Sequence, residues 1–146
     1  MTAQQEIVIN TDANLAVRKG NLQVENNSIH INGGIFSALE ASVSIDQSLK
    51  IDGAESMVLL RDGQLSIGEG YNNNGGSTVY YENMCIDIAN GNYISNYNLE
   101  VFVNSYLTVA NGNLEYTGNT GSFTTNAFRL GTVSYTHLTL PTIYSV

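Results

Sequence analysis

The chain has 146 residues, a length that fits one domain, and its composition excludes several classes of function. Charged residues make up 12% of it, the net charge is −8, and the five basic residues form no cluster. We therefore expect neither nucleic acid nor an anionic membrane as a partner, because both require phosphate-neutralising charge. No apolar run approaches the length of a membrane span, so no membrane insertion is expected. The 19 asparagines and 14 glycines, with no tryptophan and one proline, favour many short strands and turns.

A short pattern recurs along the chain: two apolar residues separated by one residue, followed by a glycine-containing turn. Residues 85–92 and 106–113 are near-copies of it, 21 residues apart. In successive copies the second apolar residue is spaced by 20, 16, 21 and 21 residues, at Ile31, Ile51, Ile67, Ile88 and Val109. A period of about 20 residues that joins an alternating strand to a Gly/Asn turn is typical of a solenoid.

In chain order, a partial copy at residues 15–24 precedes the first full one, and two further alternating pieces flank most turns. Three short strands per coil predict an all-β, single-stranded right-handed parallel β-helix (β-solenoid) of about five coils, each of roughly 20–21 residues. An antiparallel meander is the competing fold, since Gly/Asn turns also form hairpins. The polar run 71–77 lies between two coils, and we expect it to loop out of the tube.

Side-chain alternation assigns an inside and an outside to each strand. The inward pairs predicted to stack in two columns are Ile29/Ile31, Leu49/Ile51, Leu65/Ile67, Ile86/Ile88 and Leu107/Val109. The residues between them should form one outward row of His30, Lys50, Ser66, Asp87 and Thr108. Such a row is either a ligand-binding face or simply the solvent-exposed side of strands whose residues alternate between inside and outside.

Residues 31–36 and 76–83 resemble coils of right-handed parallel β-helix proteins of the pectate-lyase-like superfamily. More narrowly, they resemble bacterial surface and autotransporter-like adhesins, and the resemblance covers about residues 15–118. It implies a location outside the cell or at the cell surface. The superfamily contains both polysaccharide-cleaving enzymes and non-catalytic adhesins, so the fold does not choose between these functions.

The last segment, Thr-Val-Ser-Tyr-Thr-His-Leu-Thr-Leu-Pro-Thr-Ile at residues 132–143, resembles a translated sequencing adapter. We therefore divide the chain into a β-solenoid fragment at residues 1–131 and an adapter-derived, non-native tail at residues 132–146. Residues 133–146 should then form no ladder with the coils. The uncapped last coil should expose a strand edge, which favours edge-to-edge self-association.

Few residues are candidates for a catalytic or metal-binding site. By coil alignment, Asp87 with Glu69 or Glu82 is the nearest candidate for a paired-carboxylate site. However, Glu82 aligns with Arg61, which predicts a cross-coil ion pair instead. Since His30 is the only histidine outside the tail and no calcium-binding nonapeptide occurs, we expect no metal site and no cofactor. The lone Cys85 should point outward, beside Gln64 and Tyr106.

These observations favour a non-enzymatic β-solenoid segment of a bacterial secreted or surface protein, acting in adhesion or glycan binding. Its expected partner is a polysaccharide or a host or cell-surface protein, and Tyr97, Tyr106 and Asp87 are the residues expected to bind it. One alternative is a fragment of a β-helix polysaccharide lyase or glycoside hydrolase whose site lies in missing coils. A further alternative is a segment of a phage tail-spike.

Overall fold

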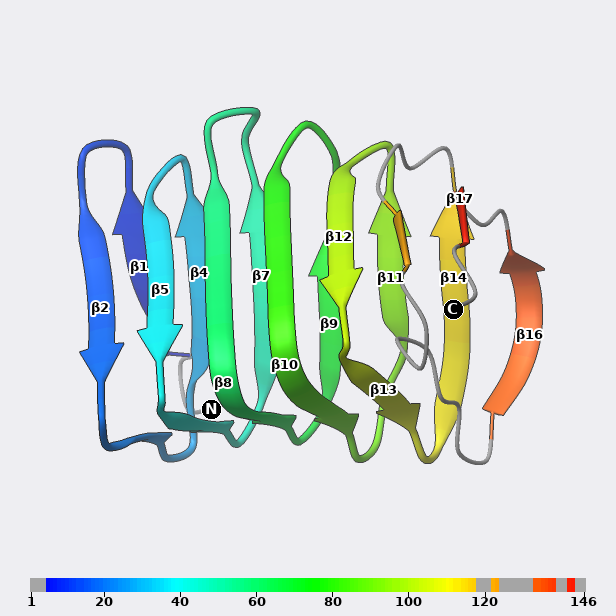
Figure 1. Cartoon of the computed structure of the whole chain (residues 1–146), viewed down its shortest axis with the longest axis horizontal. Helices are drawn as coiled ribbons and strands as arrows, with labels where there is room; N and C mark the ends of the chain where they lie inside the picture. Colours follow the sequence, from blue (N-terminus) through cyan, green and yellow to red (C-terminus); the bar gives the residue numbers. More distant parts are fainter. Residues whose placement is uncertain (1–4, 118–121, 124–132, 139–141, 144–146) are drawn as a thin grey trace.

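A computed structural model describes residues 5–117, 122–123, 133–138 and 142–143. It shows a parallel β-solenoid of about five turns with no helix among the described residues, which confirms the predicted fold class and excludes the antiparallel meander. The strands stack side by side along the long axis of the molecule (Figure 1). Paired residues on neighbouring coils are 20 to 22 positions apart, as in Ile31 with Ile51 and Ile9 with Ile31.

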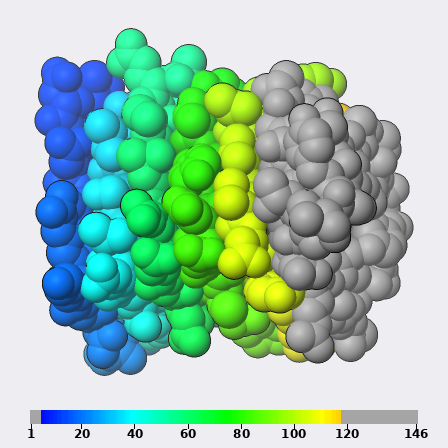
Figure 2. Space-filling view, viewed as in Figure 1, coloured from blue at the N-terminus to red at the C-terminus, as the bar shows by residue number. Residues whose placement is uncertain are grey.

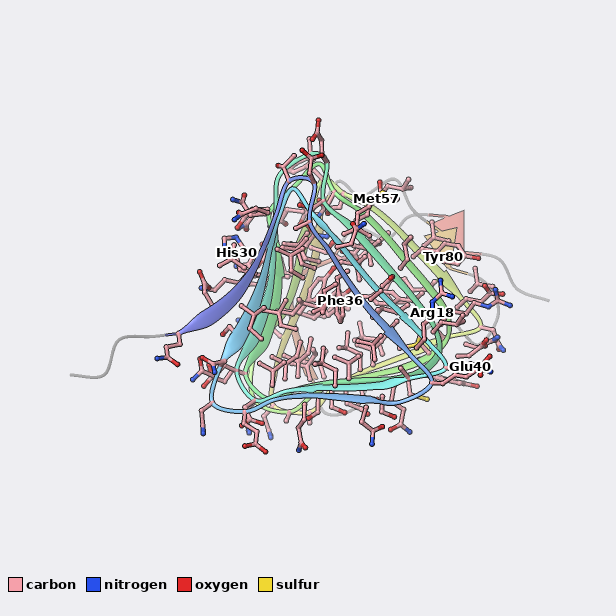
Figure 3. All side chains as sticks on the ribbon, turned by 90° about the vertical axis from the view of Figure 1, so that its left-hand side faces the viewer. Arg18, His30, Phe36, Glu40, Met57 and Tyr80 are labelled. Atoms are coloured by element: carbon pink, nitrogen blue, oxygen red, sulfur yellow. The ribbon has the colours of Figure 1, made fainter. Side chains whose placement is uncertain are left out.

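Three sheet faces enclose the core, and the cross-section is triangular (Figure 3). The first face contains β1 (Glu6–Asn10), β4 (Ser28–Asn32), β7 (Ser48–Asp52), β9 (Gly70–Asn73), β11 (Tyr93–Asn96), β14 (Gly112–Thr117) and β16 (Val133–Leu138). The second face contains β2 (Asn14–Arg18), β5 (Ile35–Leu39), the first halves of β8 (Met57–Ile67) and β10 (Thr78–Ile88), β12 (Leu99–Val103), β15 (Ser122–Phe123) and β17 (Thr142–Ile143). The third face contains β3 (Asn21–Val24), β6 (Ser42–Ile45), the second halves of β8 and β10, and β13 (Tyr106–Val109).

Seen from the N-terminal end, the chain runs up the first face, down the second and back along the third (Figure 3). This path is clockwise as the coils recede from the viewer, so the solenoid is right-handed, as predicted. We call the corner between the first and second faces the apex. The corner between the second and third faces is the second corner, and that between the third and first faces is the third corner.

The predicted inward columns are wrong in one respect, because they join two different faces. Ile51 lies on the first face and pairs with Asn73, whereas Ile67 lies on the third face and pairs with Ile45. The 16-residue step between Ile51 and Ile67 is therefore a passage between faces within one coil. All the residues assigned to the columns are nevertheless buried, since each face presents its own alternating strand to the core.

The polar run 71–77 does not loop out of the tube, contrary to our prediction. Its first part belongs to β9, where Tyr71 and Asn73 are fully buried on the first face. Only the turn that follows is exposed in part, and there Gly75 and Gly76 have φ values of +123° and +78°. Polar residues can occupy this strand because other buried polar groups hydrogen-bond to them.

The second corner repeats one backbone conformation in every coil. A column of five residues with positive φ, each non-glycine, turns the chain there: Lys19, Glu40, Asp62, Asn83 and Asn104, with φ between 48° and 56°. Within it, Asn83 donates a hydrogen bond to Asp62 and Asn104 donates one to Asn83. At the third corner, Asn111 likewise donates to Asn90 over 3.2 Å, so these equivalent residues of the two near-copies lie on adjacent coils.

The tail prediction is wrong for the tail strands that the structure describes. Strand β16 pairs with β14 in parallel, from Gly112 opposite Val133 to Tyr116 opposite Leu138, with a register shift between Leu114 and Glu115. Strand β17 similarly pairs with β15. The extended backbone of residues 133–138 and 142–143 thus continues the ladder. The remaining residues of the tail lie outside the described part of the chain.

Candidate functional site

The third face brings Tyr106 and Asp87 together. Tyr106 begins β13 and pairs with Cys85, and Asp87 lies two positions along β10, opposite Thr108. Both side chains point outward; the Tyr106 side chain is 39% exposed and that of Asp87 is also exposed. As diagonal neighbours on adjacent strands, they are within reach of one ligand.

Tyr97 lies elsewhere. It occupies the apex, and the five residues of β12, a length of about 17 Å, separate this corner from the second corner, where β13 begins. Its side chain is 70% exposed, and its φ is +54°. This left-handed conformation is unfavourable for a bulky residue. The predicted trio therefore divides into a pair on the third face and a single tyrosine at the apex.

The predicted outward row also divides. His30 and Lys50 are neighbours on the first face, where Asn72 follows them. Ser66, Asp87 and Thr108 are neighbours on the third face. The cause is the mixing of faces already described for the inward columns, so no single surface displays all five side chains.

A charged cluster surrounds His30 on the first face. The His30 Nε2 atom lies 2.7 Å from a carboxylate oxygen of Asp52, and Nδ1 lies 3.4 Å from Glu6. Lys50 approaches Glu6 at 3.8 Å, and Asn74 donates a hydrogen bond to the second Asp52 oxygen over 2.7 Å. These contacts join residues from successive coils, and they are partly exposed, so their net effect on stability is small. Among the described residues, no group of three or more His, Cys, Asp or Glu side chains is arranged to hold a metal ion.

The carboxylates proposed as a catalytic pair do not converge. Glu82 lies on the second face, where it approaches Arg61 at 3.6 Å, and this ion pair was predicted. Asp87 lies on the third face, and Glu69 follows the end of β8 at the third corner. Cys85 is exposed beside Gln64 and Tyr106, as predicted.

No protein family, curated protein or solved structure matches this chain. Within the described residues, no helix is long and apolar enough to cross a membrane.

Sequence reasoning missed a buried polar cluster near the apex. Glu100 on β12 points into the core and is fully buried. One of its carboxylate oxygens accepts hydrogen bonds from Tyr71 at 2.9 Å, Asn73 at 3.0 Å and Ser95, and the other accepts one from Tyr93 at 2.6 Å. The rings of Tyr71 and Tyr93 stack with their centroids 4.1 Å apart.

Burial raises the pKa of the Glu100 carboxyl, while the four donors oppose the rise. The cluster is enclosed by the coils, so it is suited to holding β9, β11 and β12 in register rather than to acting on a substrate. The burial of Glu100 could have been predicted from the sequence. Glu100 follows Val79 by 21 residues, at a position where the pattern requires an inward side chain.

Proposed function

We propose that this chain is a non-enzymatic β-solenoid segment of a secreted or surface protein that binds an extended polysaccharide. The observation that carries the proposal is Tyr97, a largely exposed aromatic residue held in a left-handed conformation at the apex. That conformation costs about 1 kcal/mol relative to glycine, and burial of the ring does not offset it. Strained residues of this kind cluster at functional sites.

The chemistry of tyrosine suits a sugar ligand, since it offers an apolar ring face together with a polar hydroxyl. Tyr106 and Asp87 add a second contact on the third face, whose outward side chains around them are Ser66, Cys85 and Thr108. Small polar side chains on a flat sheet leave room for a chain that lies across several coils. The net charge of −8 favours neutral glycans over acidic ones.

Binding of the full chain to insoluble cellulose and xylan, measured by depletion from solution, tests this proposal. We expect retention that falls at least fivefold in Tyr97→Asn, because asparagine tolerates positive φ and lacks the ring. Tyr106→Ala should weaken retention as well. Tyr80→Ser, on the second face, is the matched control and should bind like the wild type. Retention that is absent in the wild type, or unchanged in Tyr97→Asn, would reject the proposal.

Experiments on the same full chain also test the two alternative functions, a polysaccharide-cleaving enzyme and a tail-spike segment. Release of reducing ends or unsaturated products from pectin or alginate, abolished by Asp87→Asn, would favour a polysaccharide-cleaving enzyme. A stable trimer in analytical ultracentrifugation would favour a tail-spike segment. We expect neither result.

A further inference from the structure

The outward side of the second face differs from the other two faces because it is largely apolar. Each strand there contributes three outward positions, and the strand register aligns them in rows. The middle row runs Ala16, Ser37, Leu59, Tyr80 and Val101 along the solenoid. Leu59 and Leu99 are 37% and 40% exposed. Figure 2 looks onto this face, and Figure 3 shows Met57, Tyr80 and Arg18 projecting from it.

A hollow lies in this face where the middle row changes from small to large side chains. Its volume is about 300 Å³, it spans β2, β5, β8 and β10, and its surface is mostly apolar. Ser37 contributes a short side chain to this hollow, while Leu39, Leu59 and Tyr80 stand around it. We call this depression the second-face hollow.

Two arginines line the hollow. Arg18 and Arg61 flank Leu39 in the row next to the second corner. The positive charge of Arg61 is compensated, since its Nε atom lies 3.3 Å from a carboxylate oxygen of Asp62 and 3.6 Å from one of Glu82. Arg18 forms no ion pair with any described carboxylate. An uncompensated guanidinium at the rim of an apolar hollow is complementary to a ligand with an apolar body and one anionic end.

We propose that the second-face hollow binds an aliphatic carboxylate. The alkyl chain lies against Leu39, Leu59 and Tyr80, and the carboxylate pairs with Arg18. Burial of the alkyl chain provides the main stabilisation. The guanidinium selects anions over cations of equal length, against the repulsion expected from a chain of net charge −8. This site is separate from Tyr97 and from the Tyr106–Asp87 pair, and it does not depend on the glycan proposal.

Isothermal titration of the full chain with dodecanoate, kept below its micelle concentration, tests the site. We expect saturable binding of one dodecanoate per chain, weaker binding of hexanoate, and no binding of dodecyltrimethylammonium. Arg18→Gln should weaken dodecanoate binding at least tenfold, and Ser37→Leu, which fills the hollow, should abolish it. Lys19→Gln is the matched control, because it removes the adjacent positive charge at the second corner, outside the hollow.

Thermal unfolding of each variant shows whether the fold is retained, and Arg18→Gln is the deciding variant if Ser37→Leu does not fold. Equal binding of the anionic and cationic alkyl chains would overturn the proposal. So would equal effects of Arg18→Gln and Lys19→Gln. A dimer in size-exclusion chromatography that both Arg18→Gln and Ser37→Leu dissociate would assign the hollow to a second copy of the chain and also overturn it.

Discussion

Glu100 occupies the inward position in its coil that Val79 occupies in the coil before it, and the two residues are paired across adjacent parallel strands. A carboxyl group thus continues a column that Phe36, Val58 and Val79 fill with apolar side chains. The position tolerates it because Tyr71, Tyr93 and their neighbours donate hydrogen bonds to both carboxylate oxygens. A fully satisfied polar network of this kind fixes the register of the strands that supply it.

The first prediction concerns pH. Since burial raises the pKa of Glu100 above its ordinary value of 4.5, the folded chain binds a proton more tightly than the unfolded chain. The contribution of the Glu100 carboxyl to the free energy of unfolding is therefore largest below about pH 4.5, and it is lost as the pH rises through the folded-state pKa. Glu100→Gln removes this loss, so the free energy of unfolding of the variant should rise relative to the wild type as the pH increases above about 4.5.

Urea unfolding at several pH values measures this difference. Glu25→Gln is the matched control, because it makes the same change at an exposed position and should show no such trend. A difference between Glu100→Gln and the wild type that is constant with pH would show that the Glu100 carboxyl has an unshifted pKa in the folded chain.

The second prediction concerns close coil packing. A Cβ atom added at Gly91 would overlap the backbone carbonyl oxygen of Glu69 in the neighbouring coil. Gly91→Ala must therefore push two coils apart, and it should destabilise the chain by about 3 kcal/mol. At Gly20 the nearest atom to an added Cβ is the Arg18 carbonyl oxygen at 3.9 Å, so Gly20→Ala should change stability by less than about 0.5 kcal/mol. Denaturant titration of both variants checks the pair; similar losses would contradict the coil contact.

Much of the fold was predictable because the 21-residue offset aligns equivalent residues directly, as it does for Ile86 with Leu107 and Asn90 with Asn111. The prediction failed between Ile51 and Ile67 because the alternating apolar pattern is the same on all faces. A local pattern reports that a side chain points inward and gives no information on which wall of the triangle carries it.

The buried polar cluster near the apex could not be predicted from the polarity of its residues alone. Asn73 and Ser95 resemble loop residues in sequence, and they are buried because Glu100, a neighbour only in the folded chain, accepts hydrogen bonds from both. Likewise, the sequence does not predict the left-handed backbone of Tyr97, since tyrosine has no preference for that conformation. The second-face hollow depends on side-chain sizes in four different coils, which no single segment reveals.

The third prediction uses the left-handed column at the second corner. Glu40 has a φ of +52° in a column where two of the later coils use asparagine, a residue that tolerates this conformation. Glu40→Asn should therefore stabilise the chain, by about 0.5–1 kcal/mol. Glu69→Asn removes the same charge from an exposed corner residue without a positive φ, and it should have almost no effect. Midpoints of thermal unfolding measure both, and equal shifts would attribute any gain to charge alone.

The fourth prediction tests whether the charged cluster on the first face ties coils together. Asp52 contacts His30 and Asn74, each over 2.7 Å, and these residues belong to the coils on either side of it. Asp52→Ala should cost about 1 kcal/mol, a value reduced by the partial exposure of the contacts. Asp87→Ala removes a carboxylate that forms no hydrogen bond or ion pair with the described residues, and it should change stability by less than about 0.5 kcal/mol.

In about 1 M NaCl, where the Debye length falls to about 3 Å, the difference in stability between Asp52→Ala and Asp87→Ala should narrow. If both variants unfold at the same denaturant concentration in low salt, the cluster contributes nothing to coil stacking, and the first face is held by its backbone ladder and buried side chains alone.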